Sequence, residues 1–144
     1  MKDINQHEKS CLVRSMTYVL NIEPLHLKRA SPHPRKLCRM YDSQKQEKLI
    51  CGLELKRQHG DFPFFEGPLK MAVIFYIRTP EKKKYLEGTY HYCKPDNSNL
   101  IKFIEDVGNG ILYKDDALIA WTDAIKIYSS NPRIEFTITY LGEV

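Results

Sequence analysis

The chain has 144 residues and a formal net charge of +4, and charged side chains make up 28% of it. This length suits one domain with a core of its own, and the composition is that of a globular protein. The longest apolar run, at 71–77, is too short to cross a bilayer, and the polar N-terminus is unlike a signal or transit peptide. We therefore expect a cytoplasmic protein with no membrane partner.

Charge is unevenly distributed along the chain. The segment 26–58 holds nine Lys/Arg and three Asp/Glu, whereas 106–144 holds six acids and three bases. A basic half beside an acidic half suits a polyanion-binding surface next to a metal-binding cluster. On composition alone, a solvated basic helix face is an equally good explanation.

The first half of the chain predicts a strand, a long loop and a helix. Residues 1–16 show no periodicity and are interpreted as an N-terminal extension, which leaves 17–144 as the domain. A strand is expected at 17–22, followed by a proline-rich, basic loop. The segment 43–59 has a helical composition. We expect Leu49, Ile50 and Leu53 on its apolar side and lysines on the other.

The segment 69–78 is strongly apolar and predicts a strand in the centre of the sheet, whereas 79–90 is a charged connection. The best-defined element is a helix at about 97–107, with Asp96 or Ser98 as its N-cap and glycines 108 and 110 at its end. Its apolar residues recur at i, i+3, i+4 and i+7. They are Leu100, Phe103, Ile104 and Val107.

Two alternating segments, 118–128 and 133–141, predict strands, and the turn sequence at 129–132 favours a hairpin between them. Trp121 is expected in the core or in a subunit interface rather than as a platform for bases. The order of elements predicts an α+β or mixed α/β fold, with a small mixed sheet and two main helices.

Carboxylates and a lysine gather around the second helix. Asp96 precedes it, Lys102 lies within it, and the loop after it delivers Asp115 and Asp116. Mg²⁺ favours carboxylate oxygens from converging elements and keeps several waters. Such a set suits phosphodiester hydrolysis, in which the metal polarises the phosphate and acidifies a water while the lysine stabilises the developing charge. Basic residues of the 26–39 loop would hold the flanking phosphates.

The same residues also fit an ordinary surface. An aspartate before a helix is often only a cap, Lys102 and Asp106 form a single i,i+4 pair, and an acidic pair in a turn is common. The residues by themselves therefore leave two hypotheses open, a nuclease site and a structural domain whose acids only cap helices and contact water.

The segment KPDNSNLIKFIEDVGNGILYKDD, at 94–116, together with Lys126, resembles the signature of the RusA family of Holliday junction resolvases. That signature reads roughly KPDxDNLxK, then a helix ending in Asp-Ala-Leu-Asn-Gly, a pair of aspartates and a downstream lysine. The segments 17–30 and 67–77 resemble the family's first strand with its basic loop and its second strand. The likeness extends from about Thr17 to the C-terminus.

The resemblance implies a RusA-like homodimer that uses Mg²⁺, or alternatively Mn²⁺, to make paired cuts in four-way or other branched DNA. Such proteins act in DNA recombination and repair and are often encoded by prophages. The resemblance assigns catalysis to Asp96, Lys102 and Asp116, and metal binding to Asp96, Asp115 and Asp116. The basic positions assigned to DNA binding are Lys28, Arg29, Arg35, Lys36, Lys94 and Lys126. The roles of Asn99 and Asp106 stay open.

One position departs from the family pattern, because Ser98 stands where the signature has a second aspartate. A serine hydroxyl is neutral and a weaker ligand for Mg²⁺. Either Asp115 supplies the missing ligand, or Ser98 binds the metal through water, or the protein binds branched DNA but cuts it poorly. We expect retained activity, because the four residues Asp96, Lys102, Asp115 and Asp116 are all present.

Overall fold

The computed structural model describes residues 14–24, 31–32, 40–41 and 44–142. Its main feature is a four-stranded mixed sheet of the order β1-β6-β4-β5. β4 pairs in parallel with β5 and antiparallel with β6, and β1 pairs antiparallel with β6. The strands are β1 (Ser15–Leu20), β4 (Leu69–Arg78), β5 (Ile119–Ser129) and β6 (Arg133–Tyr140). The predicted mixed α+β class, with β4 inside the sheet, is confirmed.

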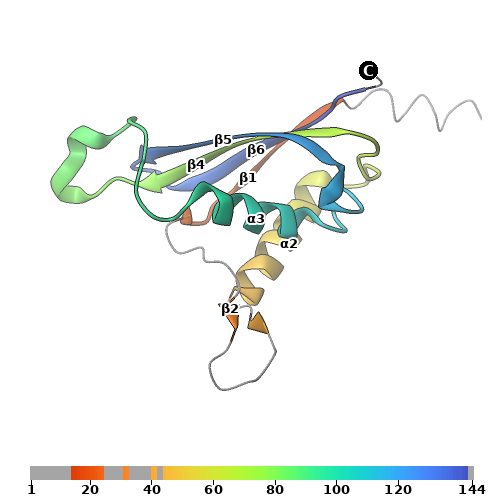
Figure 1. Ribbon diagram of the computed structural model, residues 1–144, viewed down its shortest axis with the longest axis horizontal. Helices are drawn as coiled ribbons and strands as arrows, with labels where there is room; N and C mark the ends of the chain where they lie inside the picture. The colour runs from red at the N-terminus through yellow and green to blue at the C-terminus, as the bar shows by residue number, and fades with distance from the viewer. Residues whose placement is uncertain (1–13, 25–30, 33–39, 42–43, 143–144) are drawn as a thin grey trace, which may run out of the picture.

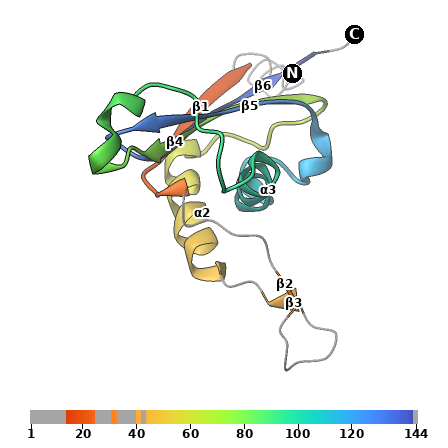
Figure 2. The same cartoon turned by 60° about the vertical axis from the view of Figure 1, so that its left-hand side comes forward.

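Two helices, α2 (Lys45–His59) and α3 (Asn97–Gly108), lie against one face of this sheet (Figures 1 and 2). A pair of two-residue strands, β2 (Ser31–Pro32) and β3 (Met40–Tyr41), precedes α2. Short 3₁₀ turns, η2 (Glu81–Leu86) and η3 (Asp116–Leu118), flank α3 in the chain. Within the described ranges, no helix has the length and apolarity that crossing a membrane requires.

The core lies between the helices and the sheet. Along β4, every second residue is at most 2% exposed, because alternate side chains of a strand point to the same face. The helical stripe predicted for α3 is confirmed, since all four of its members are buried. Burying a side chain of this size contributes roughly 1.5–3 kcal/mol. The core therefore holds α3 at a set rotation, with its polar side turned outward.

The two C-terminal strands do not form the predicted hairpin. β4 lies between β5 and β6 and pairs with both, so the turn at 129–132 spans a strand instead of joining neighbours. Turn residues determine only the local reversal of the chain. β4 and β5 are parallel, and the chain between them contains η2 and α3, as a parallel pair requires a long crossover connection.

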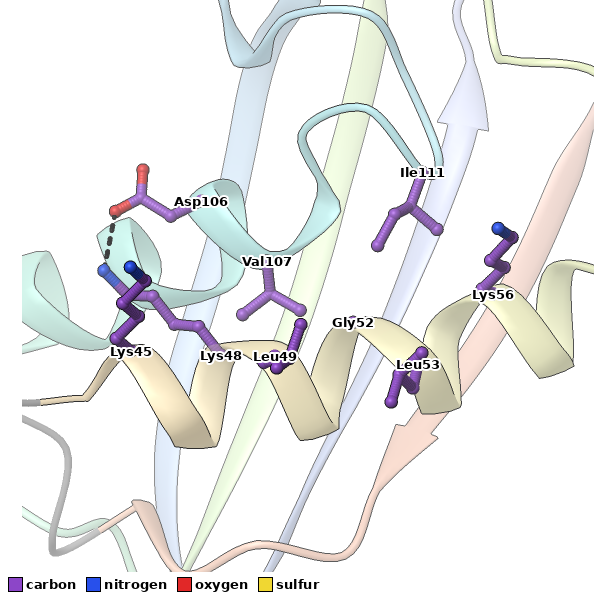
Figure 3. A pocket seen from close by; sticks show the side chains of 9 residues that line it. All are labelled: Lys45, Lys48, Leu49, Gly52, Leu53, Lys56, Asp106, Val107 and Ile111. Carbon is purple, nitrogen blue, oxygen red and sulfur yellow. Dashed lines mark hydrogen bonds and ion pairs between the residues drawn. The ribbon is translucent and has the colours of Figure 1, made fainter.

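The prediction of which side of α2 is buried is wrong. Leu49, Ile50 and Leu53 are 63–67% exposed, and the helix packs instead through Cys51, Gly52, Leu55 and His59. Gly52 permits a close approach, because a Cβ there would lie 3.2 Å from the Ile111 methyl. Apolar residues occupy both sides of α2, so periodicity alone could not identify the buried one. Leu49 and Leu53 line a cavity of about 390 Å³ between α2 and α3 (Figure 3).

Trp121 of β5, which was expected in the core or in a subunit interface, lies outside the core. The register places Trp121 and Ile125 opposite Lys70 and Ile74 of β4, on the face away from the helices. Trp121 is half exposed, with Lys70 Nζ 3.9 Å from its ring centroid, so it is not a core residue. The alternate set, which includes Lys126, faces the helices.

Tyr18 and His59 form a buried polar contact, and we expect Tyr18→Phe to destabilise the fold by about 1–3 kcal/mol. The Tyr18 hydroxyl lies 2.7 Å from His59 Nδ1, and His59 Nε2 lies 3.0 Å from the Pro63 carbonyl. Since that carbonyl only accepts, Nε2 donates to it and Nδ1 accepts from Tyr18. Urea unfolding should show the loss, whereas Tyr92→Phe, at an exposed ring, should change nothing. Equal stabilities for the two variants would contradict this prediction.

Candidate active site

Lys102 of α3 lies at the centre of a group of acids. Its Nζ is 3.1 Å from Asp116 Oδ2, 3.2 Å from Asp106 Oδ1 and 4.0 Å from Glu105 Oε2. Hydrogen bonds to Asp116 and Asp106 raise the pKa of Lys102. The side chain is therefore an ammonium group at neutral pH, and it acts through its charge rather than as a base.

The turn after α3 brings Asp116 to Lys102. Tyr113 is buried against Gly108, its hydroxyl donates to the Glu105 carbonyl at 3.0 Å, and Gly110 donates its N–H to the Tyr113 carbonyl at 2.8 Å. Gly110 has φ +76°, a left-handed conformation that glycine adopts without strain. The chain thus folds back along α3, and the acidic pair after Tyr113 reaches the helix.

The two acids of that pair have different partners. Asp115 Oδ1 accepts from the Ala117 N–H at 2.9 Å and so caps η3. Burial alone would raise the pKa of Asp116, but the hydrogen bonds from Lys102, Asp115 and Asn109 together with the charge of Lys102 outweigh it, and the pKa of Asp116 is lowered. Asp116 is therefore a carboxylate paired with an ammonium group. Because the Lys102 side chain is half exposed, the pair adds little to stability.

Asp96 stands at the N-cap position of α3 but does not cap it. Its side chain accepts no hydrogen bond from the helix N–H groups, and it pairs instead with Lys94 Nζ at 2.9 Å. The loop before it is held by Lys126, whose Nζ donates to the carbonyls of Cys93 and Pro95, each at 2.8 Å. The Asp96 carboxylate is thus half exposed, on a loop with a fixed backbone.

The structure divides the predicted site residues into two groups. Lys102 contacts both Asp106 and Asp116, whereas Asp96 lies with Lys94. In the first turn of α3, Ser98 is exposed and Asn99 is partly buried. Four predicted DNA-binding residues lie outside the described residues; they are Lys28, Arg29, Arg35 and Lys36.

Lys48 of α2 also belongs to this neighbourhood, and the sequence did not single it out. Its Nζ lies 3.2 Å from Asp106 Oδ2 (Figure 3). The other oxygen of Asp106 contacts Lys102, so Asp106 connects the two lysines. Lys48 and Asp106 are 58 positions apart in the sequence, and no local pattern links them. The basic character of 26–58 was the one available signal.

The acids present are chemically suited to a hard divalent cation. Across the described part of the chain, no three His, Cys, Asp or Glu side chains lie close enough to enclose a metal. Mg²⁺, however, keeps most of its waters and is commonly held by one or two carboxylates. Asp96 and Asp115 are exposed and Asp116 is partly exposed, so each offers carboxylate oxygens of this kind, but the structure does not gather the three into one group.

The chain folds into a small mixed α+β domain, and sequence comparison identifies its class. Residues 24–139 match the family described as "Endodeoxyribonuclease RusA", which covers most of the chain. The chain therefore belongs to the RusA family of endodeoxyribonucleases.

Two relatives illustrate the similarity. The "Crossover junction endodeoxyribonuclease rusA" of Lactococcus phage r1t is 34% identical over 73 residues, which are 50% of this chain and 54% of that protein. The "Uncharacterized protein YqaN" of Bacillus subtilis (strain 168) is 32% identical over 90 residues, which are 56% of this chain and 63% of that protein. The matches thus span about half to three-fifths of these relatives.

Proposed function

We propose that the protein is a metal-dependent, structure-specific endonuclease that resolves four-way DNA junctions by paired phosphodiester cleavage. Its family and the name of the phage relative support this activity. The observation that carries the proposal is the contact of Lys102 with Asp116. A helix and the turn after it place an ammonium group 3.1 Å from a carboxylate at a partly exposed position.

Each residue of the site has a proposed role. Asp96, Asp115 and Asp116 are the ligands for Mg²⁺ or Mn²⁺, which when bound would polarise the scissile phosphate and acidify a water. Lys102, held as an ammonium group, stabilises the negative charge that develops on the phosphate. Asp106 orients Lys102 from the other side and is itself held by Lys48.

We place the nuclease domain at 17–144 and the DNA contacts at its basic residues. Lys94 lies beside Asp96 and is suited to a phosphate near the cut. Lys126 already donates to two carbonyls, so we propose that it chiefly positions the Asp96 loop. The remaining contacts are Lys28, Arg29, Arg35 and Lys36 from the basic loop.

The proposal includes a homodimer, because a four-way junction offers two equivalent strands and each chain carries one Lys102–Asp116 pair. Light scattering on the purified protein should give twice the chain mass of 16.9 kDa. A monomer at working concentrations that nevertheless makes paired cuts would remove the dimer from the proposal.

A cleavage assay on a labelled synthetic junction tests the activity. We expect symmetric nicks with Mg²⁺ or Mn²⁺, no nicks with a chelator, and no cutting of a linear duplex made from the same arm sequences. Equal cutting of junction and duplex would show a nuclease without structural selectivity. An intact junction in both metals would refute the catalytic proposal.

The second candidate function is a binder of branched DNA that does not cut it. Two observations favour it: Ser98 replaces a family aspartate, and the described acids do not enclose a metal. A junction that shifts on a gel while staying intact would support this binder. If affinity for the junction does not exceed that for duplex at moderate salt, only a structural role remains.

Ser98→Asp separates the two functions. We expect the added carboxylate to raise the cleavage rate about tenfold, because a charged ligand holds the cation better than a hydroxyl does. The measurement is the single-turnover rate across a Mg²⁺ titration, and Ser98→Asn serves as the uncharged control. Unchanged rates and metal dependence in Ser98→Asp would mean that position 98 does not limit the reaction.

A further inference from the structure

A projecting lobe between β4 and α3, formed by residues 81–92, has no part in the site described above. η2 makes up its first half and has no buried residue. Figures 1 and 2 show it in bright green beyond the end of the sheet, from which the chain continues into α3. Its sequence, EKKKYLEGTYHY, has three consecutive lysines followed by three tyrosines.

Three tyrosine rings of the lobe face solvent. Tyr85, Tyr90 and Tyr92 are 70–87% exposed, although a ring of this size normally contributes by being buried. His91, between the last two, is only 7% exposed, so the side chains alternate as they do in extended backbone. Tyr90 and Tyr92 therefore point to the same side, about 6.6 Å apart along the chain. This spacing is close to two base steps of a nucleic acid strand, at about 3.4 Å each.

The backbone beneath these rings is fixed. Residues 88–91 run antiparallel along the outer edge of β5: Tyr128 accepts from the Gly88 N–H at 3.0 Å and donates its own N–H to Thr89 at 3.0 Å, and Lys126 accepts from the His91 N–H at 2.9 Å. The His91 ring packs edge-on against Tyr128, with centroids 4.9 Å apart. Rings presented from a rigid base need less ordering on binding.

The lobe also carries a small excess of positive charge, since its three lysines stand against the two acids Glu81 and Glu87. Among the residues that the structure describes, no carboxylate lies within ion-pair distance of Lys82, Lys83 or Lys84. Glu87 is occupied elsewhere, because it accepts from the Thr79 hydroxyl and from the Ser130 N–H. Three free ammonium groups next to exposed rings match a ligand that alternates phosphates with flat bases.

The lobe is continuous with the proposed active site. Lys126 connects them, since its carbonyl accepts from His91 and its ammonium group holds the loop that carries Asp96. A strand lying over Asp96 would therefore meet Tyr92 and then Tyr90. Rings stack only on bases that have left the duplex, whereas a duplex presents its phosphates and groove edges.

We propose that the lobe binds unpaired DNA bases at the branch point, with Tyr90 and Tyr92 as stacking platforms, Tyr85 as an additional ring, and Lys82–Lys84 on the adjoining phosphates. This inference rests on the proposed function in so far as DNA is the substrate. It adds a specific subsite to that function, because it supplies selectivity for branched over linear DNA from residues outside the acidic cluster.

The test compares two triple variants of the full chain, Tyr85→Leu/Tyr90→Leu/Tyr92→Leu and the same positions changed to Phe. Affinities are measured by fluorescence anisotropy in chelator for oligothymidylate, a linear duplex and a four-way junction. Because the Leu variant loses the stacking rings, its affinity for oligothymidylate and for the junction should fall about tenfold or more. Duplex binding should change by less than about twofold, and the Phe variant, which keeps the rings, should match wild type. Circular dichroism verifies the fold of each protein.

A 2-aminopurine base at the branch point provides a direct signal. Its fluorescence should change on binding to wild type and to the Phe variant, and should not change with the Leu variant. Lys82→Gln/Lys83→Gln/Lys84→Gln should weaken binding to all three DNAs and reduce the salt dependence of oligothymidylate binding by a slope of about two.

The outcomes distinguish this proposal from the resolvase proposal. If the wild type cuts junctions and the Leu variant binds and cuts them equally well, the proposal for the lobe is wrong and the resolvase proposal stands. If the Leu variant loses affinity equally for all three DNAs, the tyrosines do not act by stacking on unpaired bases, and the proposal for the lobe is also wrong. If the Leu substitutions change the oligomeric state but no DNA affinity, the lobe is a protein interface and the proposal is wrong. Tyrosine-dependent binding of oligothymidylate by a protein that ignores junctions overturns the resolvase and leaves the lobe as a single-strand-binding surface.

Discussion

Asp116→Asn should lower the rate of junction cleavage by at least about a hundredfold while junction affinity changes only a few-fold. Asparagine keeps the shape of the side chain and an oxygen for Lys102, which lies 3.1 Å away, but it removes the negative charge. That charge is what would hold a divalent cation at this position. The readout is the single-turnover rate in saturating Mg²⁺, with binding measured separately in chelator.

Asp123→Asn is the matched control for this variant. Asp123 is an exposed carboxylate of β5 that pairs with Lys70 at 3.3 Å, on the sheet face away from the helices. We expect wild-type cleavage from it. If Asp116→Asn is folded and keeps more than about a tenth of the wild-type rate, Asp116 does not have the proposed role.

Gly108→Ala should destabilise the protein by about 2 kcal/mol and reduce cleavage by more than the loss of folded protein explains. A Cβ at Gly108 would lie 2.5 Å from the Tyr113 hydroxyl oxygen and 2.7 Å from Cζ. The ring is buried and cannot move aside freely. Because Asp115 and Asp116 follow soon after Tyr113, a shifted ring also displaces the acids from Lys102. Thermal unfolding should show a fall of several degrees.

Gly52→Ala is the corresponding control in α2. There the new Cβ meets only the end of the Ile111 side chain, at 3.2 Å, and alanine favours a helix by about 1 kcal/mol over glycine. We expect equal or higher stability and unchanged cleavage. A Gly108→Ala protein as stable as Gly52→Ala would show that the packing of Tyr113 on α3 tolerates an extra methyl group.

Local patterns predicted the elements whose environment is uniform along their length. β4 contains an unbroken apolar run at 71–77 and α3 carries one unbroken stripe, and both were found with nearly their observed bounds. α2 was predicted as a helix with the wrong face, because apolar residues occur on both of its sides and only packing against the sheet selects one. The predicted hairpin of β5 and β6 is wrong for a similar reason, because long-range pairing with β4 decides which strands are neighbours in the sheet.

The sequence by itself determined the composition of the candidate site and its family, because those depend on residue type and spacing within 94–126. Only the tertiary structure decided which charges meet. It paired Lys102 with Asp116 and Asp106, left Asp96 with Lys94, and brought Lys48 to Asp106 from α2. It also turned Lys126 toward the loop before Asp96. The physical reason is that periodicity encodes which side of an element is apolar, whereas contacts between charged groups depend on how packed elements are placed in space.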